Sequence, residues 1–329
     1  MLYIHQYPDW TSFRYNFQSV MDALGQARLQ EGKLLGIYDL VNDRNDERET
    51  LAQDIWATFS IDDDGVTDKD QEYFQVEIQK MNDATAKVRN ILGALHNANL
   101  PLTAERLFAW HAAVGQNKVR QFRSKENAWG VSPGRIEQEM NRFLHWFETS
   151  TEDGVLKAAI AQFWFLTIRP FDDGNGIMAR TLSTMLLARS EGATRCCCAL
   201  NLQILKNRDE YFKILAKAQQ GNGDLTQWIL WFLKMFRSAV EESQQKLMQA
   251  VQQLQFRQKF KDTHFTPRER TLLDGIRNGT LPRPFSARDA AALTGVSHDS
   301  ALRDIQSLIQ KGVLKAENKG GRSTRYSTL

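Results

Sequence analysis

A short acidic segment rich in glycine, DDGNG at residues 172–176, has the residue types that fit ligand binding or catalysis best. Pro170 precedes it and disfavours a helical residue before it, while Gly174 and Gly176 permit turn conformations that a β-carbon resists. Apolar residues at helical spacing flank the segment, so we expect one helix to end before it and another to begin directly after it. Free N–H groups at the start of that second helix would attract an anion, most commonly phosphate.

Two carboxylates, Asp172 and Asp173, lie within this predicted anion site. Mg²⁺ is usually held by one or two carboxylates together with phosphate oxygens of a substrate, which would explain acidic side chains beside a phosphate. A solvated acidic turn that binds no ligand explains the same residues equally well. The spacing alone therefore leaves both interpretations open.

The helices on either side of the segment must position it. The first, over residues 155–168, is apolar nearly all round, so it should lie at the centre of the fold. The second resumes helical spacing at Ile177 and should end at Gly192, a suitable C-cap.

The stretch from Thr167 to Arg180, TIRPFDDGNGIMAR, resembles the Fic signature, His-Pro-Phe-x-(Asp/Glu)-Gly-Asn-Gly-Arg-x-x-Arg. Seven fixed positions agree, whereas Arg169 stands at the His position and Ile177 at the first Arg position. The resemblance implies a mainly α fold, a Fic-like helical bundle, and transfer of AMP from ATP with Mg²⁺ to a protein hydroxyl. By position it implies a metal carboxylate, a phosphate cradle and a phosphate clamp, namely Asp173, the backbone of Gly174, Asn175 and Gly176, and Arg180.

Arg169 replaces the residue that acts as general base in Fic enzymes. A guanidinium stays protonated and has no lone pair to accept a proton, so Arg169 should be inactive in that role. Losing a general base lowers a rate by roughly 10²–10⁴-fold. Ile177 also removes a charge from the phosphate site, because an alkyl group cannot replace a bidentate arginine. We expect a pseudoenzyme that binds ATP; a slow but active nucleotidyltransferase is the alternative.

A second resemblance lies upstream of the signature. Fic inhibitory helices often carry Ser/Thr-x-x-x-Glu-Gly/Asn, whose Glu pairs with the second signature arginine and blocks productive ATP binding. Thr58 and Asp62, in a possible inhibitory helix near residues 50–63, occupy the corresponding positions. Asp is one methylene shorter than Glu, and Asp63 replaces the small residue. Either an inhibitory contact with Arg180 or a plain acidic turn fits this stretch.

Other residues near the site have ordinary interpretations. His111 and His145 lie on apolar helical faces beside tryptophans, where core packing is the commoner role. Residues 115–133 stand where Fic proteins carry a flap that pins the target by strand addition, but the segment is too short for a full flap. Its basic side chains fit either a rim over the anion site or a solvated loop: Lys118, Arg120, Arg123 and Lys125. Farther along the chain, Tyr211 and Phe212 follow the family pattern of aromatic residues near adenine.

At 329 residues and 42% hydrophobic composition, the chain is long enough for two or three domains. We divide it into an N-terminal helical region at 1–98, a Fic-like domain at 99–240, a helical linker at 241–262 and a small α+β domain at 263–329. The first region resembles the uncharacterised segment that often precedes one subgroup of Fic domains. Long helices are expected over 70–96, 202–219 and 225 to about 260, and the apolar linker residues Leu247, Val251, Leu254 and Phe256 could pack on a partner chain in a homodimer.

The last segment has the signals of a winged helix-turn-helix domain. Thr266 and Ser286 begin capping boxes, a third helix follows at 299–310, and two short strands flank the Gly-rich turn NKGGRS. From Lys261 onward there are 12 Lys/Arg and 7 Asp/Glu, so the net charge of this segment is +5. The net charge of the whole chain is +3, so the remaining residues carry −2. DNA binding and protein docking or dimerisation are the alternatives, and DNA contact would use His298 and Arg303 for bases and Lys319, Arg322 and Arg325 for phosphates.

Composition also bears on localisation. No run approaches the ~18 apolar residues of a membrane helix, and the N-terminus lacks the basic and apolar regions of a signal peptide. The three cysteines are adjacent, at 196–198, and so form neither a disulfide framework nor spaced zinc ligands. We expect a cytoplasmic protein that does not enter membranes, and the sequence does not indicate its protein target.

Overall fold

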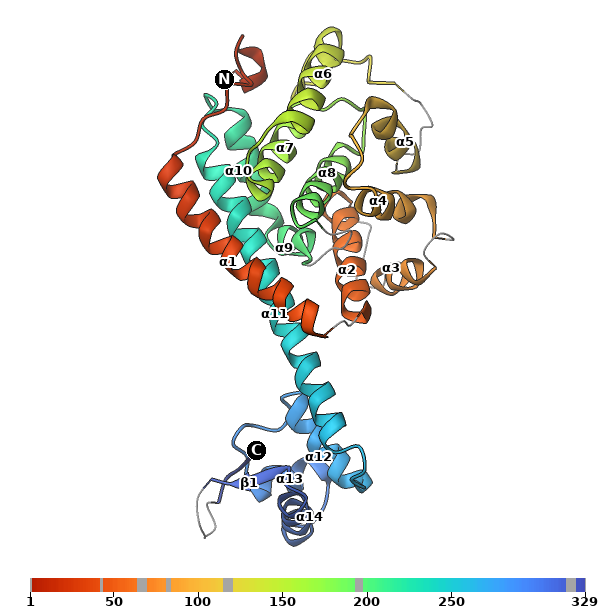
Figure 1. Cartoon of the computed structure of the whole chain (residues 1–329), viewed down its shortest axis with the longest axis vertical. Coiled ribbons are helices and arrows are strands. Elements are labelled where there is room, and N and C mark those ends of the chain that lie inside the picture. The colour runs from red at the N-terminus through yellow and green to blue at the C-terminus, as the bar shows by residue number, and fades with distance from the viewer. Residues whose placement is uncertain are drawn as a thin grey trace. The chain divides into compact units, whose positions relative to one another are not determined.

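The computed structural model describes residues 2–41, 44–63, 70–80, 84–114, 121–192, 198–317 and 324–328. These residues form fourteen α-helices, one short 3₁₀ helix and one two-stranded sheet (Figure 1). The chain divides into two compact units, Met1–Val251 and Gln252–Leu329. Among the described residues, no helix combines the length and apolarity needed to cross a bilayer.

The described residues of the first unit form helices joined by loops. It begins with the 3₁₀ helix η1 (Ile4–Gln6) and continues, in order, with α1 (Phe17–Val41), α2 (Arg44–Asp62), α3 (Asp70–Gln79), α4 (Ala86–His96), α5 (Ala104–Val114), α6 (Pro133–Thr149), α7 (Gly154–Ile168), α8 (Asn175–Ser190), α9 (Leu200–Lys206), α10 (Arg208–Gln219) and α11 (Thr226–Lys259). The last turns of α11 belong to the second unit.

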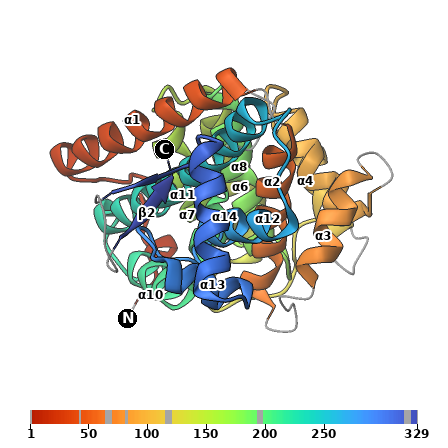
Figure 2. The same ribbon diagram turned by 90° about the horizontal axis from the view of Figure 1, so that it is seen from below.

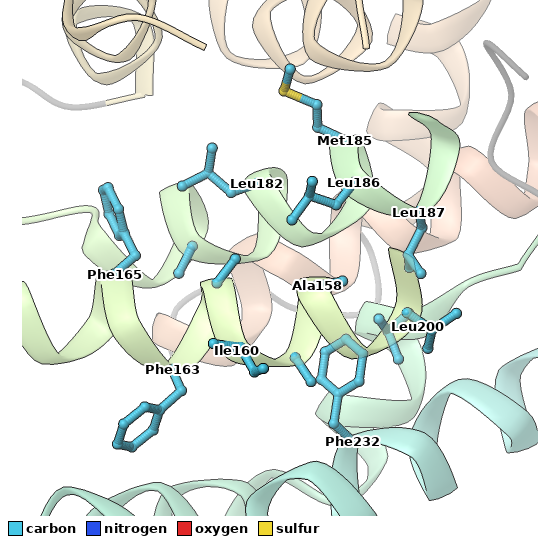
Figure 3. Packing of buried hydrophobic residues seen from close by; sticks show 14 of the residues in the cluster. Ala158, Ile160, Phe163, Phe165, Leu182, Met185, Leu186, Leu187, Leu200 and Phe232 are labelled. Atoms are coloured by element: carbon cyan, nitrogen blue, oxygen red, sulfur yellow. The ribbon is translucent and has the colours of Figure 1, made fainter. Parts of the chain in front are cut away.

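Helices α7 and α8 form the centre of this unit, as predicted for the first of them. Every residue from Val155 to Ile168 is buried, so α7 has no solvent face. Its start is fixed by the Asp153 carboxylate, which accepts a hydrogen bond from the Val155 N–H at 2.9 Å. In Figure 3 the two helices run side by side, with Phe232 of α11 reaching α7 from the opposite side. A site at the junction of α7 and α8 is therefore carried by the most buried helices of the unit.

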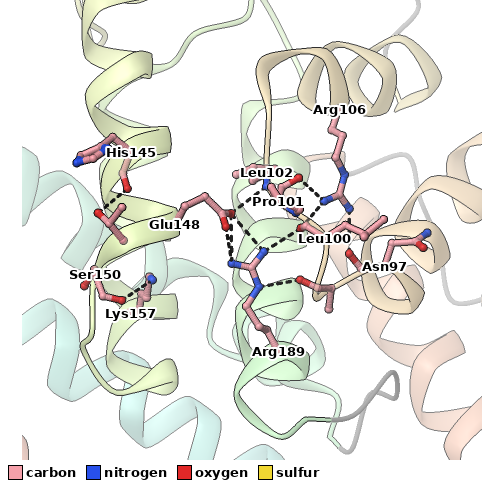
Figure 4. Close-up of polar contacts among 12 residues, drawn as sticks. Asn97, Leu100, Pro101, Leu102, Arg106, His145, Glu148, Ser150, Lys157 and Arg189 are labelled. Carbon is pink, nitrogen blue, oxygen red and sulfur yellow. Dashed lines mark hydrogen bonds and ion pairs between the residues drawn. The ribbon is translucent and has the colours of Figure 1, made fainter.

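Two arginines hold the turn between α4 and α5: Arg189 ties it to the end of α8, and Arg106 ties it to α5 (Figure 4). Arg189 donates to the carbonyl oxygens of Ala98 at 2.7 Å and Leu100 at 3.1 Å, and its Nη1 lies 3.2 Å from a Glu148 carboxylate oxygen. Arg106 donates to the same Leu100 carbonyl at 2.7 Å. These contacts satisfy backbone carbonyls that would otherwise lack partners where α4 ends.

A second cluster of buried apolar side chains joins α2, α3 and α4, which lie together on one side of the unit in Figures 1 and 2. The single helix expected over 70–96 is wrong, because α3 and α4 are separate. The Glu77 carboxylate accepts the N–H of Thr85, which is the N-cap residue of α4, and so stabilises the chain reversal. The helix expected over 202–219 is likewise two, divided at Asn207, whose side-chain amide donates to the Gln203 carbonyl at 2.9 Å.

The second unit contains α12 (Pro267–Arg277), α13 (Ala287–Thr294), α14 (His298–Gln310) and the antiparallel pair β1 (Leu314–Ala316) and β2 (Tyr326–Thr328), in which Lys315 lies opposite Ser327. Both predicted capping boxes are present, at Thr266 and Ser286. Leu247 is buried within the first unit, so the prediction that it packs on a partner chain is wrong. Phe256 is partly buried against the core of the second unit.

Candidate functional site

The predicted loop between α7 and α8 is present and sharply bent. Helix α7 ends at Arg169, which adopts the left-handed conformation with φ 48° and ψ 63°. Gly174 also has a positive φ, 67°, and is the N-cap residue of α8. Among the described residues, Arg169 is the single non-glycine residue with positive φ. A left-handed residue with a β-carbon costs about 1–2 kcal/mol, so its surroundings must hold it there.

Two buried side chains hold the loop. The Asn175 amide accepts from the Phe171 N–H at 3.0 Å and donates to the Phe171 carbonyl at 2.8 Å. Arg123, only 5% exposed, donates through Nε to the Arg169 carbonyl at 2.7 Å, and its backbone N–H binds the Pro170 carbonyl at 2.9 Å. Its proposed place in a basic rim is therefore wrong, because the guanidinium is used inside the protein. Of the other rim candidates, Lys125 is exposed, and Lys118 and Arg120 lie outside the described residues.

A cavity of about 600 Å³ opens beside this loop. One wall is the loop itself, from Asp173 to Gly176, together with the side chain of Arg169. Another wall is α10 with the residue after it: Arg208, Tyr211, Phe212, Leu215, Ala216, Gln219 and Gln220. Residues from other parts of the chain complete the cavity: Tyr3, Asp62, Trp129 and Leu166. The structure thus brings most of the predicted site residues into one space.

Arg180 does not line the cavity but lies directly behind the loop, completely buried. Its Nε donates to the Thr58 hydroxyl at 2.8 Å, and Nη2 donates to the Thr58 carbonyl at 2.7 Å and to Asp62 Oδ2 at 2.8 Å. Burial alone would lower the pKa of Arg180, but the charge of Asp62 and the nearby Tyr211 hydroxyl outweigh it and raise that pKa. The arginine is therefore a cation neutralised by the end of α2, and the pairing considered from the sequence is present.

The Asp62 carboxylate also lies on the first turn of α8. A β-carbon placed on Gly176 would be only 2.1 Å from Asp62 Oδ2, far inside van der Waals contact. Glycine is required here for this close approach rather than for its φ angle. The start of α8 is the predicted anion cradle. The Asp62 carboxylate therefore occupies the space beside that cradle.

Arg169 projects into the cavity over an exposed tryptophan. Its guanidinium carbon lies 5.6 Å from the centre of the Trp129 ring, a cation–π contact. Burial lowers the pKa of Arg169, and the charge of Asp62 offsets only part of this shift. An arginine starts from so high a pKa that it remains a cation at neutral pH. The sequence placed Trp129 in a polar loop and gave no signal that it would pair with Arg169.

Asp173 contacts a histidine that the sequence assigned only to the core. His111 is buried, its ring stacks on Phe171 with centroids 3.9 Å apart, and its Nε2 lies 3.2 Å from both Oδ1 and the carbonyl oxygen of Asp173. Core burial is correct, but the contact with Asp173 was missed because the two are 62 residues apart in sequence.

The donor set fits a metal ion only if a substrate supplies further oxygens. The Asp173 side chain is 54% exposed and so accessible from the cavity. No group of three or more His, Cys, Asp and Glu side chains is placed to hold a metal within the part of the chain that the structure describes. Mg²⁺ commonly accepts one carboxylate, substrate phosphates and water, so Asp173 would suit a substrate-bridged ion.

The predicted DNA-contacting residues are only partly described. His298 and Arg303 are exposed on α14. Arg325 lies directly before β2, with its Nη1 3.5 Å from the Asp289 carboxylate. Lys319 and Arg322 fall outside the described residues.

Comparisons with known proteins agree with this architecture. Residues 101–187 match the Fic/DOC family, and residues 3–71 match a domain of unknown function, DUF4172. The chain therefore carries a Fic/DOC-family domain behind a DUF4172 region, and the predicted family and mainly α fold are confirmed. No curated protein is similar enough in sequence to count as a match.

Solved structures share the fold at low sequence identity. A Fic family protein from Desulfovibrio desulfuricans is 20% identical with a TM-score of 0.56, over 94% of this chain and 95% of that one. A Fic domain containing signaling protein from Bacteroides thetaiotaomicron is 16% identical with a TM-score of 0.51, over 69% of this chain and 98% of its own. Fic-1 from C. elegans, residues 134–508, is 20% identical with a TM-score of 0.52, over 72% and 75%.

Proposed function

We propose that this protein binds ATP with Mg²⁺ in the cavity between the loop and α10, and that it transfers AMP to protein hydroxyls poorly or not at all. The observation that carries the proposal is the position of Arg169, whose guanidinium enters the cavity where a Fic enzyme would have its general base. A cation without a lone pair cannot accept the hydroxyl proton. It can still attract a phosphate, which favours binding over turnover.

The contact between α2 and Arg180 supports a restrained state of the same site. Asp62 neutralises the arginine that would clamp a phosphate, and its carboxylate lies against Gly176. A phosphate that approached the start of α8 would meet this negative charge. Thr58 and Asp62 therefore act as an inhibitory pair in the proposal, and nucleotide binding competes with them.

A nucleotide-binding and labelling experiment tests the proposal. Calorimetry of the wild type with ATP and Mg²⁺ should show binding, while labelled ATP should leave the protein unlabelled and pyrophosphate should not be released. The double variant Arg169→His with Asp62→Ala restores a base and removes the inhibitory carboxylate, so it should release pyrophosphate. Failure of the wild type to bind ATP would reject the proposal.

The alternative is an active nucleotidyltransferase that uses another base or none. Efficient self-labelling by the wild type, with pyrophosphate released in equal amount, would favour this alternative. The variant Arg169→Lys would then show whether a base at position 169 increases the activity. A lysine can lose its proton in a buried site, whereas an arginine does not, so a pH-dependent gain would point to a base at this position.

We propose as a second function that residues 252–329 bind duplex DNA as a winged helix. Its support is the exposed face of α14, with His298 and Arg303, followed by the antiparallel strands β1 and β2 in a segment of net positive charge. A gel shift of duplex DNA should weaken with salt and weaken further in Arg303→Ala. Gln306→Ala, also exposed on α14, is the matched control.

A further inference from the structure

The cavity contains one residue from the extreme N-terminal segment, Tyr3. The Fic/DOC match begins at residue 101, so this aromatic side chain belongs to the DUF4172 region rather than to the Fic domain. It is half-buried and stacks on the His5 ring with centroids 5.8 Å apart. The Fic signature does not account for it, and neither does the phosphate chemistry described above.

The segment that carries Tyr3 is firmly attached. Ile4 and His5, which follow Tyr3 directly, are both buried. Arg135 donates to the His5 carbonyl at 3.1 Å, and the Tyr3 N–H is satisfied by the Gln6 side chain at 2.7 Å. Two adjacent buried residues and these hydrogen bonds make Tyr3 part of the wall rather than a loose tail.

Helix α10 shows which end of the cavity Tyr3 belongs to. Its first residue, Arg208, donates to the Ile61 carbonyl at 2.7 Å, next to Asp62, and its last, Gln219, donates to the Leu166 carbonyl at 3.2 Å. Twelve residues of helix separate these ends by roughly 16 Å. Helix η1 contacts α10, and Arg14, farther along the same segment, exchanges backbone hydrogen bonds with Gly223 and Leu225, a few residues beyond the end of α10. From these contacts we assign Tyr3 to the side of the cavity where α10 ends, away from Asp62.

The two ends differ in chemistry. Near Asp62 the wall consists of the glycine loop and the cations Arg169 and Arg208, which suit phosphates. Tyr211 and Phe212, the aromatics that follow the family pattern near adenine, lie in the first turns of α10, between this end and the other. Toward the end of α10 the wall consists of Tyr3 with apolar side chains and two amides: Leu166, Leu215, Ala216, Gln219 and Gln220. A tyrosine among apolar side chains with amide groups nearby suits a heteroaromatic ring, which stacks on tyrosine and hydrogen-bonds at its rim.

We propose that Tyr3 is a ligand-contacting residue that stacks against the base of the bound nucleotide, so that the DUF4172 region recognises the ring of the ligand while its Asp62 opposes the phosphates. This inference rests on the proposed nucleotide binding. It adds that the region before the Fic domain contributes to both ends of one site. A ligand that has both a base and phosphates would engage Tyr3 and displace Asp62 together.

Calorimetry with three ligands separates ring from phosphate. Adenosine monophosphate, ATP with Mg²⁺ and inorganic tripolyphosphate with Mg²⁺ are titrated into the full chain and its variants. In Tyr3→Ala the two adenine ligands should lose roughly 5- to 100-fold in affinity, the range of one base–aromatic stack, while tripolyphosphate keeps its wild-type affinity. Tyr3→Phe should behave as the wild type. Tyr7→Ala removes an exposed tyrosine four residues away that does not line the cavity, and should change none of the three affinities.

The outcomes distinguish the two proposals. Equal ATP affinity in wild type and Tyr3→Ala, or an equal loss for ATP and tripolyphosphate, would overturn the stacking role while leaving nucleotide binding intact. A wild type that binds none of the three ligands would overturn the proposed function and this inference with it. Thermal unfolding of each variant shows whether a loss of affinity reflects a loss of fold, and Tyr3→Phe retains the ring if Tyr3→Ala unfolds.

Discussion

Replacing Asp62 by alanine should change stability and phosphate affinity in opposite directions. The change removes the hydrogen bonds that Arg180 donates to Asp62 at 2.8 and 3.4 Å, and leaves a completely buried guanidinium whose remaining side-chain partners are Thr58 and the Tyr211 hydroxyl. A hydrogen bond to a charged group contributes about 1.5–3 kcal/mol, but the Asp62 side chain is 32% exposed, so solvent screens part of it. We expect the free energy of unfolding to fall by about 1–2 kcal/mol, and the melting temperature by roughly 2–6 °C.

The same change removes a negative charge from the start of α8. Two unit charges about 4 Å apart repel each other by roughly 4 kcal/mol at an effective dielectric constant of 20, and salt and side-chain movement reduce this value. A gain in tripolyphosphate affinity of about tenfold, or 1.4 kcal/mol, is a conservative expectation. Asp62→Asn keeps the shape of the side chain and should reproduce most of the gain, because charge rather than volume opposes the phosphate.

Calorimetry with tripolyphosphate and Mg²⁺, together with thermal unfolding, measures both effects. Glu49→Ala removes the same charge from an exposed position on the same helix and should change neither quantity by much. Lower stability without any gain in phosphate affinity would refute the reasoning, since it would mean that Asp62 supports α2 but does not exclude anions from the cavity.

Three further predictions follow from contacts elsewhere. Gly154→Ala should lower the free energy of unfolding by about 1–3 kcal/mol in chemical denaturation, because its β-carbon would lie 2.2 Å from the side chain of the last residue of α8, whereas Gly134→Ala, with nothing within 4 Å, should not destabilise. Burial raises the pKa of Asp54 to about 7, despite two hydrogen bonds from Asn201. The folded protein then binds one proton more than the unfolded chain between about pH 4 and 7, so stability should fall as pH rises through that window, by on the order of 4 kcal/mol, and Asp54→Asn should flatten the profile. Asp173→Asn should abolish the difference in ATP affinity with and without Mg²⁺, and an unchanged difference would place the metal elsewhere.

The central part of the site could be predicted from sequence because its signals are local. Proline and glycine mark where α7 stops and α8 begins, and the continuous apolar run of α7 can only be buried. The seven agreeing signature positions all lie within twelve residues, so their spacing is visible in the sequence itself. The pairing of Thr58 and Asp62 with Arg180 was also open to prediction, but only through the family resemblance, since the partners are more than 115 residues apart.

The remaining parts of the site depend on tertiary contacts that leave no local pattern. Arg123 looks like any loop arginine, yet it is buried because its donors match carbonyls of the loop. Tyr3 lies in the cavity because the residues after it are anchored to α6, which no periodicity reveals. The helix predicted over 70–96 divides because a carboxylate in α3 accepts the N–H of Thr85, a choice that propensity cannot rank.

The two departures from the Fic signature affect the same site in different ways. Arg169 removes a proton acceptor, while Ile177 removes a cation and does not line the cavity. Instead Ile177 is buried in the second cluster with residues of α2, including Ile55 and Phe59. Its apolar contacts thus help to hold α2, and with it Asp62, against the start of α8. Ile177→Arg would bury a charge in that cluster and release α2 at the same time, so only Arg169→His isolates the question of the missing base.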